Sequence, residues 1–268
     1  MKNPKISVVI NTFNEEAYIR KCIESVLTFA DEVLVCDMYS DDRTVAIASE
    51  LGAKVIYHDK VGFVEPARYY AVANATGDWV LLLDADEYIT SDLGLKLREL
   101  IQQPDVDLIT IGKLYFYFAN YIKRGGFYLK SSPLFFKKEL YINNFTDENM
   151  KIFKGCIHLK PASKKTIEIG DKYYIWHDAY PSIEKFVAKT NSKYAFIEAK
   201  QMYADGEKFS LYKLLWDPTK TFLKKYLYQL AILDGVNGLI LCVLYANYRF
   251  NVWANVWQLE NDEKKIKK

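Results

Sequence analysis

Three acidic side chains, Asp84, Asp86 and Glu87, come directly after the apolar run 79–83 (WVLLL). A short apolar run of this kind is typical of a buried strand, so the carboxylates gather where the strand ends. Carboxylates this close repel one another, and a hard divalent cation is the partner that oxygen ligands favour. The alternative is an ordinary turn with solvated acids, because acidic residues are common in turns.

The elements that must position these carboxylates alternate along the first third of the chain. The sequence predicts strands at 5–10, 32–37, 53–57 and 79–83, and helices at 18–27, 44–51 and 65–75. Such alternation predicts a parallel sheet with right-handed crossovers. In sheets of this class ligands bind beyond the carboxyl ends of the strands. Thr12, Asp37 and the acidic cluster all fall at those ends.

Four sequence blocks, in order, carry a resemblance to a known family. They are 7–16 (SVVINTFNEE), 35–44 (VCDMYSDDRT), 67–71 with 75–79 (ARYYA and ATGDW), and 83–87 (LDADE). With these blocks the chain resembles the family 2 glycosyltransferases, and among them the bacterial enzymes that add sugars to lipopolysaccharide core or related surface glycans. The resemblance extends weakly to 153–158, 175–177 and 234–239. It implies an α/β, GT-A (Rossmann-like) fold with a mostly parallel central sheet flanked by helices.

The resemblance also implies an inverting transfer of a sugar from a nucleotide donor to a glycan or lipid-linked acceptor. Bound Mn²⁺ or Mg²⁺ would neutralise the charge of the departing diphosphate. Asp86 is the first candidate metal ligand, and Asp84 lies on the same face of an extended segment, where the resemblance places it at the ribose or a metal-bound water. Glu87 is a candidate for metal ligation, for helix capping or for support of the ligands. His177 either completes the metal site or is a hydrogen-bonded structural residue.

Several other residues are candidates for holding the nucleotide. Thr12, Asn14 and Glu15 occupy the turn after the first strand. Asp37 ends the strand that the resemblance places beside the base, where its carboxylate could accept the imide hydrogen of uracil, which favours UDP. Arg68 is either an exposed cation on the helix surface or, as the resemblance implies, a residue whose guanidinium forms bidentate hydrogen bonds with phosphate oxygens.

The general base that takes the acceptor's proton is left open among three residues. Relatives in this branch often have a His-Glu pair where this chain has His158 followed by Leu159. Asp147, Glu148 and His158 are therefore the candidates for the catalytic base. The missing Glu also keeps a second hypothesis open, namely a non-catalytic GT-A module or partner subunit. A nucleotidyltransferase is disfavoured because 11–16 contains no glycine.

The chain changes character near residue 182, so we expect a nucleotide-sugar-binding and catalytic domain at 1–181 and a helical region at 182–268. Lysines and aromatic residues intermingle there: Lys220, Lys224 and Lys225 with Trp216, Phe222, Tyr226 and Tyr228. They either pack against the sheet or form an amphipathic surface at a lipid interface. The apolar segment 239–246 by itself is too short to span a bilayer. We expect peripheral membrane contact, because a lipid-linked acceptor would require it.

Composition agrees with an intracellular enzyme. The 268 residues carry a net charge of +2, so no nucleic acid partner is expected. Four cysteines, Cys22, Cys36, Cys156 and Cys242, lie in apolar contexts without paired spacing, which is typical of reduced core residues. No signal peptide precedes the first strand. We therefore expect a cytoplasmic protein, peripheral on the inner face of the plasma membrane, that could form a homo-oligomer.

Overall fold

The computed structural model describes residues 3–60, 64–144, 163, 165–170 and 172–266, which form two compact units. The first unit comprises 1–113 and 129–177, and the second comprises 114–128 and 178–268. Two of the boundaries fall inside strands, β6 (Leu108–Tyr117) and β10 (Tyr174–Tyr180). The division of function between 1–181 and 182–268 stays a prediction.

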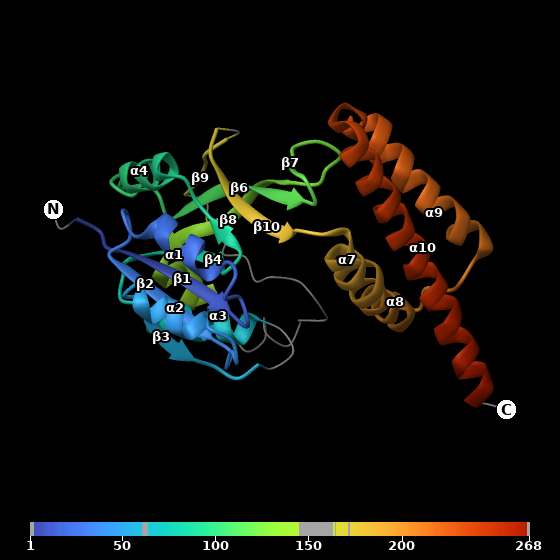
Figure 1. Cartoon of the computed structure of the whole chain (residues 1–268), viewed down its shortest axis with the longest axis horizontal. Coiled ribbons are helices and arrows are strands. Elements are labelled where there is room, and N and C mark those ends of the chain that lie inside the picture. Colours follow the sequence, from blue (N-terminus) through green and yellow to red (C-terminus); the bar gives the residue numbers. More distant parts are fainter. Residues whose placement is uncertain (1–2, 61–63, 145–162, 164, 171, 267–268) are drawn as a thin grey trace. The chain divides into compact units, whose positions relative to one another are not determined.

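A mixed sheet forms the centre of the first unit (Figure 1). Its strands follow the order β3-β2-β1-β4-β8-β6-β10-β5, and β9 pairs with β6. The first four of these strands are parallel, whereas β8 pairs antiparallel to both β4 and β6. The bounds of the strands not yet given are β1 (Ile6–Thr12), β2 (Glu32–Asp37), β3 (Lys54–Tyr57), β4 (Trp79–Asp84), β5 (Glu87–Tyr88), β8 (Leu129–Lys137) and β9 (Thr166–Glu168).

Helices cover both faces of this sheet. Strand residues alternate between the two faces, so Ile10 joins one apolar core and Val9 the other. One core contains residues of α1 (Ile19–Val26), α2 (Thr44–Glu50) and α4 (Ser91–Leu100). The other contains residues of α3 (Glu65–Asn74) and α5 (Lys138–Asn144). The strand and helix alternation predicted for the first third of the chain is confirmed.

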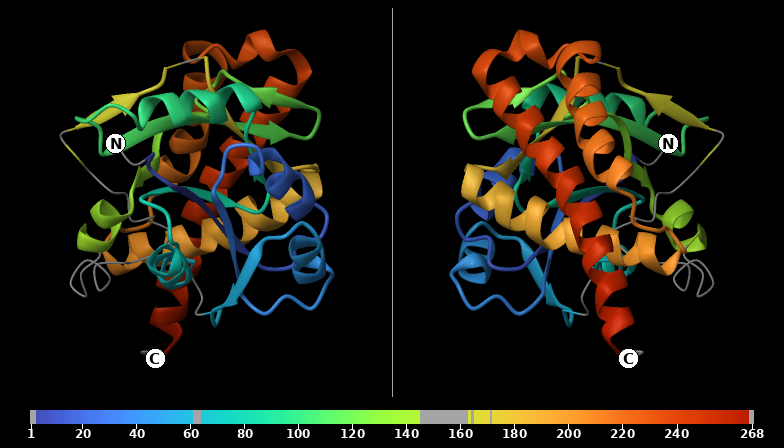
Figure 2. Two further views of the ribbon diagram at one scale, coloured as in Figure 1. Left: turned by 90° about the vertical axis from the view of Figure 1, so that its left-hand side faces the viewer. Right: turned by 90° about the vertical axis from the view of Figure 1, so that its right-hand side faces the viewer.

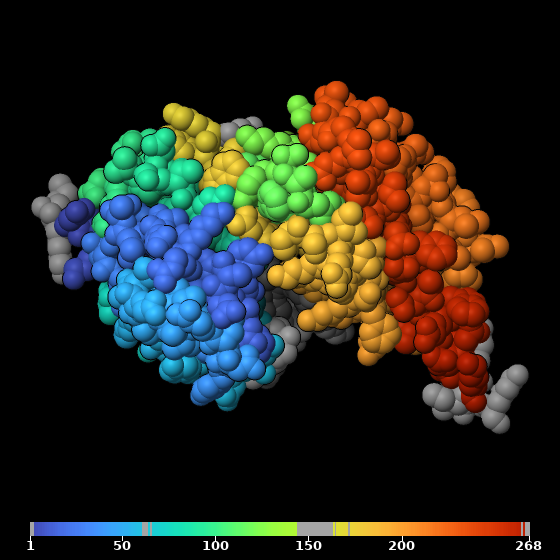
Figure 3. All heavy atoms as spheres, viewed as in Figure 1, coloured from blue at the N-terminus to red at the C-terminus, as the bar shows by residue number. Residues whose placement is uncertain are grey.

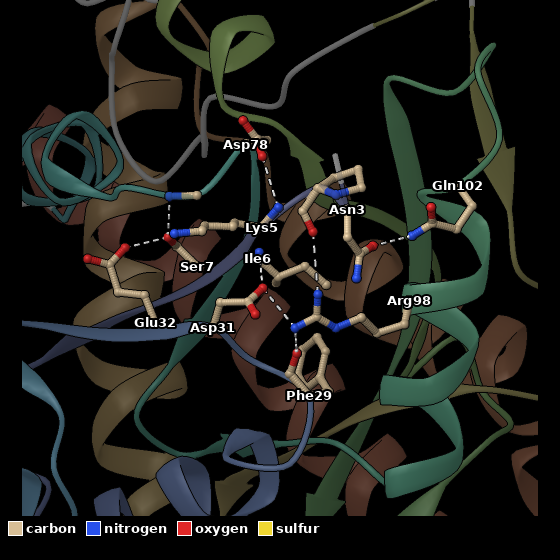
Figure 4. Close-up of polar contacts among 12 residues, drawn as sticks. Asn3, Lys5, Ile6, Ser7, Phe29, Asp31, Glu32, Asp78, Arg98 and Gln102 are labelled. Atoms are coloured by element: carbon tan, nitrogen blue, oxygen red, sulfur yellow. Dashed lines mark hydrogen bonds and ion pairs between the residues drawn. The ribbon is translucent and has the colours of Figure 1, made fainter. Parts of the chain in front are cut away.

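The amino ends of β1 and β4 are joined by a network of polar contacts (Figure 4). Ser7 is fully buried; its hydroxyl donates to Glu32 and accepts from the Gly77 N–H at 2.8 Å. A Cβ on Gly77 would lie 2.6 Å from the Ser7 nitrogen, so only glycine allows this approach. Arg98 donates to Asp31 at 2.8 Å and also to the Phe29 carbonyl. The buried Ser7 hydroxyl and the buried Gly77 N–H therefore both have partners.

The second unit is mainly helical (Figure 2). It begins with the end of β6, which pairs with β7 (Asn120–Ile122), and it includes the end of β10. Two aromatic and aliphatic clusters form its core. Its helical segments are α7 (Ile183–Phe186), the π-helical η1 (Val187–Tyr194), α8 (Ala195–Ala204), α9 (Leu211–Leu223), the π-helical η2 (Lys224–Tyr228), the 3₁₀-helical η3 (Ala231–Asp234) and α10 (Gly235–Ile266).

Helix α10 is 32 residues long and lies beside α9 (Figures 2 and 3). The stretch Ala231–Glu263 is long and apolar enough to cross a membrane, and 22% of its apolar window is buried. This is weak grounds for a span, because core helices of soluble proteins pass the same test. The segment 239–246 alone is too short to span a bilayer, but the whole of helix α10 is long enough.

Three residues expected on a lipid-facing surface pack into the second unit instead. The ammonium of Lys225 donates to the Gly125 carbonyl at 3.0 Å and lies 4.1 Å from the centre of the Phe127 ring. Phe222 and Tyr226 pack against the core that includes Phe127. The prediction is therefore wrong for these three side chains, because their side of the helix faces the core. Burial also lowers the pKa of Lys225 to about 8.

Candidate functional site

Polar residues of neighbouring strands meet at the carboxyl end of the parallel sheet. In the ladder Thr12 pairs with Asp37, and Asn11 pairs with Asp84. The strands end together because they run parallel and in register. The structure thus brings Thr12, Asp37 and Asp84 to one edge, as the sequence predicts.

Arg68 reaches this edge from α3 and binds Asp84. The guanidinium lies 2.6 Å from the Asp84 carboxylate, and Arg68 is only 8% exposed. Burial would raise the pKa of Asp84, but the charges of Arg68 and Lys113 and the hydrogen bond from Arg68 hold it well below its usual range. Arg68 is therefore not an exposed surface cation, and Asp84 is a carboxylate at neutral pH.

A second charged group forms where β4 turns into β5. His177 on β10 pairs with Glu87 in the ladder, and its Nε2 lies 3.1 Å from an Asp86 oxygen. Its Nδ1 lies 3.3 Å from Glu87 Oε1. Glu87 is 1% exposed; it binds the Lys113 ammonium and accepts from the Asp84 N–H at 3.1 Å. Asp84, Asp86, Glu87 and His177 therefore lie in one group.

The two sides of the His177 ring have different roles in this group. Burial would lower the pKa of His177, but the hydrogen bond with Asp86 and the negative charges of Glu87 and Asp86 raise it above its ordinary value. Metal-binding imidazoles commonly have a carboxylate against the nitrogen that does not bind the metal. Glu87 occupies that position, which leaves Nε2 beside Asp86.

This donor set fits a divalent cation only in part. Asp86 and His177 present one carboxylate and one imidazole side by side, donors that suit Mn²⁺. Across the part of the chain that the structure describes, no group of three or more His, Cys, Asp or Glu side chains is arranged to hold a metal. The described residues would thus supply two ligands, and the phosphates of a bound nucleotide could supply others.

Asn14 and Glu15 join the two loops that flank the site. The Asn14 amide donates to Asp41 at 2.7 Å and accepts from the Asp41 N–H at 3.0 Å. The Glu15 N–H donates to Thr44 at 2.8 Å. Asn14 adopts φ 55°, a conformation that asparagine tolerates better than most residues. These contacts fix the loop, and a nucleotide contact by either residue stays a prediction.

Asp37 shapes the next loop. It is fully buried; one oxygen accepts from the Ser40 N–H at 2.8 Å and the other from the Ser40 hydroxyl at 2.5 Å. Each carboxylate oxygen has two lone pairs, so acceptor capacity remains. The role of Asp37 toward uracil stays a prediction.

Two buried polar side chains at this edge differ from the rest. Asn11 is 4% exposed and Thr12 is 2% exposed. Within residues 3–60, 64–144, 163, 165–170 and 172–266, neither the Asn11 amide nor the Thr12 hydroxyl has a hydrogen-bond partner. Thr12 was expected at this site from the sequence, whereas Asn11 was not singled out.

The candidate bases Asp147, Glu148 and His158 lie outside the described residues. Lys113 was missed by the sequence analysis, although a lysine inside the apolar run 108–114 is an available signal. A buried lysine in a strand requires an anionic partner. The sequence did not identify Glu87 as that partner.

Comparison with known proteins identifies the family. The family model described as glycosyl transferase family 2 matches residues 7–162. An uncharacterized glycosyltransferase of Rickettsia typhi is 32% identical over 262 residues, covering 95% of this chain and 87% of the relative. One from Rickettsia bellii is 31% identical over 264 residues, covering 95% of this chain and 87% of the relative. The chain belongs to glycosyl transferase family 2.

A solved structure confirms the fold. The S. aureus TarS fragment 1–349, in complex with UDP, aligns with a TM-score of 0.52 at 19% identity. The alignment covers 96% of this chain and 92% of the TarS chain. The GT-A fold that the sequence predicts is therefore confirmed, and the chain is a glycosyltransferase by family.

Proposed function

We propose that the protein transfers a sugar from a nucleotide donor, with a UDP-sugar favoured, to a glycan or lipid-linked acceptor, with inversion at the sugar. The observation that carries the proposal is the group formed by Asp84, Asp86, Glu87 and His177 at the carboxyl end of β4. Arg68 adds a buried cation at the same edge. The bacterial surface-glycan or lipopolysaccharide pathway follows from the resemblance noted above.

Each residue of the group has a distinct part in this proposal. Asp86 and His177 Nε2 would hold Mn²⁺ or Mg²⁺, which when bound neutralises the charge that develops on the leaving diphosphate. Glu87, fixed by Lys113, orients His177. Asp84 would contact the ribose or a metal-bound water. Arg68 orients Asp84, and its guanidinium charge would lie beside a phosphate of the donor.

Thermal-shift measurements test the donor site. The melting temperature is measured with UDP, GDP, dTDP and CMP sugars, each with and without Mn²⁺. We expect the largest increase with UDP-sugars and Mn²⁺, because a ligand that binds the native state raises its stability. Equal shifts with and without Mn²⁺ would contradict the metal assignment. Binding without any release of UDP, in the presence of candidate glycan acceptors, would favour the alternative of a non-catalytic GT-A module.

We also propose peripheral membrane contact through the exposed face of α9 and η2. Leu215 (59%), Trp216 (47%), Leu227 (51%) and Tyr228 (83%) are exposed on it at helical spacing. A shallow, mostly apolar groove of about 520 Å³ crosses this face, lined by Trp216, Lys220, Leu223, Lys224, Leu227 and Tyr228. Its charged residues are both lysines, which complements anionic headgroups.

Co-sedimentation with anionic phosphatidylserine vesicles tests this contact. Lys220→Glu with Lys224→Glu should lower vesicle binding at least tenfold, because each basic residue near an anionic surface contributes about 1 kcal/mol. The matched control is Lys193→Glu with Lys200→Glu, the same charge change at exposed lysines of η1 and α8. Wild-type protein that stays in the supernatant at low salt would leave the face as an oligomer surface or ordinary exposed packing.

A further inference from the structure

One face of helix α10 is apolar and exposed. At intervals of seven residues it carries Val236, Val243, Phe250 and Trp257, which are 73%, 51%, 41% and 52% exposed, and Leu239 lies between the first two. Side chains with this spacing form one stripe along a helix, here about 32 Å long at 1.5 Å per residue. These five residues form the α10 stripe. The exposed face of a surface helix is usually polar, so a continuous apolar stripe indicates a binding surface.

The opposite face of α10 supplies its contacts with the rest of the second unit. Leu241, Val252 and Val256 are fully buried and belong to the two cores of the unit. At 3.6 residues per turn these three side chains lie on the side of the helix away from the α10 stripe. The fold is therefore packed without the stripe, which is left available to a partner.

The α10 stripe is electrically neutral. In the sequence from 235 to 258, Arg249 is the only charged residue, and it is paired with carboxylates of α8 and α9. The face of α9 and η2 differs, because Lys220 and Lys224 flank its apolar residues. Attachment to an anionic bilayer requires such basic residues, whereas a face that binds its own copy must be complementary to itself. A neutral apolar stripe meets the second requirement and not the first.

The sizes of the side chains favour an antiparallel pair of stripes. Val236 and Val243 make the stripe small toward the start of α10, whereas Phe250 and Trp257 make it large toward the end. A two-fold axis near Ala246 would place the valine half of one stripe against the aromatic half of the other, which fills the interface evenly. A parallel pair would place valine against valine and leave gaps there. A spacing of seven is also the one at which two helices stay in contact over several turns.

We propose that two copies of this chain pair through the α10 stripe, as an antiparallel and two-fold symmetric pair of helices. Association removes five apolar side chains from water, which drives it. The pairing goes beyond the proposed sugar transfer and does not depend on it, because the stripe contains no residue of the donor site.

Sedimentation equilibrium of the full chain in detergent-free buffer tests the pairing. Val243→Glu with Phe250→Glu brings carboxylates together across an antiparallel pair, so the Kd of the dimer should rise at least about 100-fold, since like charges in an interface are strongly unfavourable. Val243→Lys with Phe250→Glu instead places an ammonium beside a carboxylate of the other chain. This variant should pair at least about tenfold more tightly than the first. In a parallel pair it would bring like charges together and would gain nothing.

The matched control is Leu211→Glu with Leu215→Glu, which introduces the same charges at exposed leucines of α9 outside the stripe. It should leave the Kd of the dimer unchanged, and all the variants should melt cooperatively because the changed positions are exposed. Wild-type protein that stays monomeric throughout the micromolar range overturns the inference, and so does a dimer that Val243→Glu with Phe250→Glu does not weaken. Equal weakening by the two stripe variants overturns the antiparallel arrangement. Monomeric protein whose binding to vesicles is lost in the stripe variants would assign the stripe to lipid and overturn the pairing.

Discussion

The two ends of the parallel strands differ in whether their buried polar groups have hydrogen-bond partners among the described residues. At the amino ends, Ser7 bonds Glu32 and the Gly77 N–H, and Arg98 bonds Asp31 and the Phe29 carbonyl (Figure 4). At the carboxyl ends, the Asn11 amide and the Thr12 hydroxyl have no partners within the described residues. Ser7 and Asn11 are both buried on β1, so burial alone does not explain the difference.

Charge is distributed with the same asymmetry. The side chains of Lys137 and Asp107, an ion pair near the amino end of β4, are 40% and 27% exposed, whereas the side chains of Lys113 and Glu87 near its carboxyl end are 10% and 0% exposed. Burying a charged side chain costs free energy. Buried charged side chains are therefore concentrated at functional sites. The comparison suggests that the amino ends stabilise the fold and that the carboxyl ends bind ligand.

Lys113→Met should give the largest loss of stability. It leaves the Glu87 carboxylate buried without its cation, and breaking a buried pair in this way costs about 3–5 kcal/mol. The matched change at the other end, Lys137→Met, should cost less than about 1 kcal/mol because that pair is solvated. Urea denaturation measures both, and adding Glu87→Gln to Lys113→Met should recover most of the loss. Equal losses for the two lysines would remove the contrast between the ends.

Asp86→Asn should lower release of UDP from the donor sugar by about 10²–10³-fold, the usual effect of removing one group that stabilises developing charge. The variant should also lose the Mn²⁺-dependent part of UDP affinity. Asp78→Asn, just before β4 at its amino end, is the control, since Asp78 is exposed and its carboxylate accepts from the Lys5 N–H at 2.9 Å, away from the candidate site. Unchanged Mn²⁺ dependence in Asp86→Asn, measured by calorimetry, rules out Asp86 as a ligand.

The alternating half of the fold follows from local pattern. The run 79–83 predicts β4 to within one residue, and 32–37 matches β2 fully, because a buried parallel strand is continuously apolar. The helical region expected at 182–268 is interrupted, because Leu230 takes φ 62° and Gly235 φ 63°, and α10 begins only at Gly235. Leucine is a helix former, so its own propensity does not predict that break.

Pattern alone predicted the candidate site only where it is local in sequence, and the family resemblance added Arg68 and His177. Asp84, Asp86 and Thr12 stand at strand ends that the pattern identifies. The Lys113 and Glu87 pair, 26 residues apart, depends on which antiparallel strands become neighbours. Periodicity predicts which face of a strand a residue lies on but not which strands are neighbours, so the sequence did not reveal this pair. The absence of a hydrogen-bond partner for the Asn11 amide among the described residues likewise became visible only once its surroundings were known.

Arg68→Met should weaken UDP binding about 10-fold to 100-fold if the guanidinium orients Asp84 and contacts phosphate. Arg98→Met, the corresponding change at the amino ends, should reduce stability without changing UDP affinity. The pKa of Asp84 is lowered in the folded state, so its stabilising contribution is present above its unfolded pKa and is lost as pH falls. The stability difference between wild type and Arg68→Met should therefore shrink from pH 7 to pH 3. A difference that grows with acid would contradict the assigned pair.

Ser7→Ala should have the smallest effect, about 1 kcal/mol of stability, with no change in UDP affinity. It removes the donor to Glu32 and leaves the Gly77 N–H without its acceptor. Burial would raise the pKa of Glu32, but the Ser7 hydroxyl and the Thr76 N–H outweigh burial and lower it. A lowered carboxyl pKa stabilises the fold above the unfolded pKa and ceases to do so in acid, so the loss should be larger at pH 7 than at pH 3. Denaturation at both values measures it. If Ser7→Ala instead lowered UDP affinity as strongly as Arg68→Met, the two ends of the strands would not be functionally separate, because a change remote from the ligand would then reach the site through the strand.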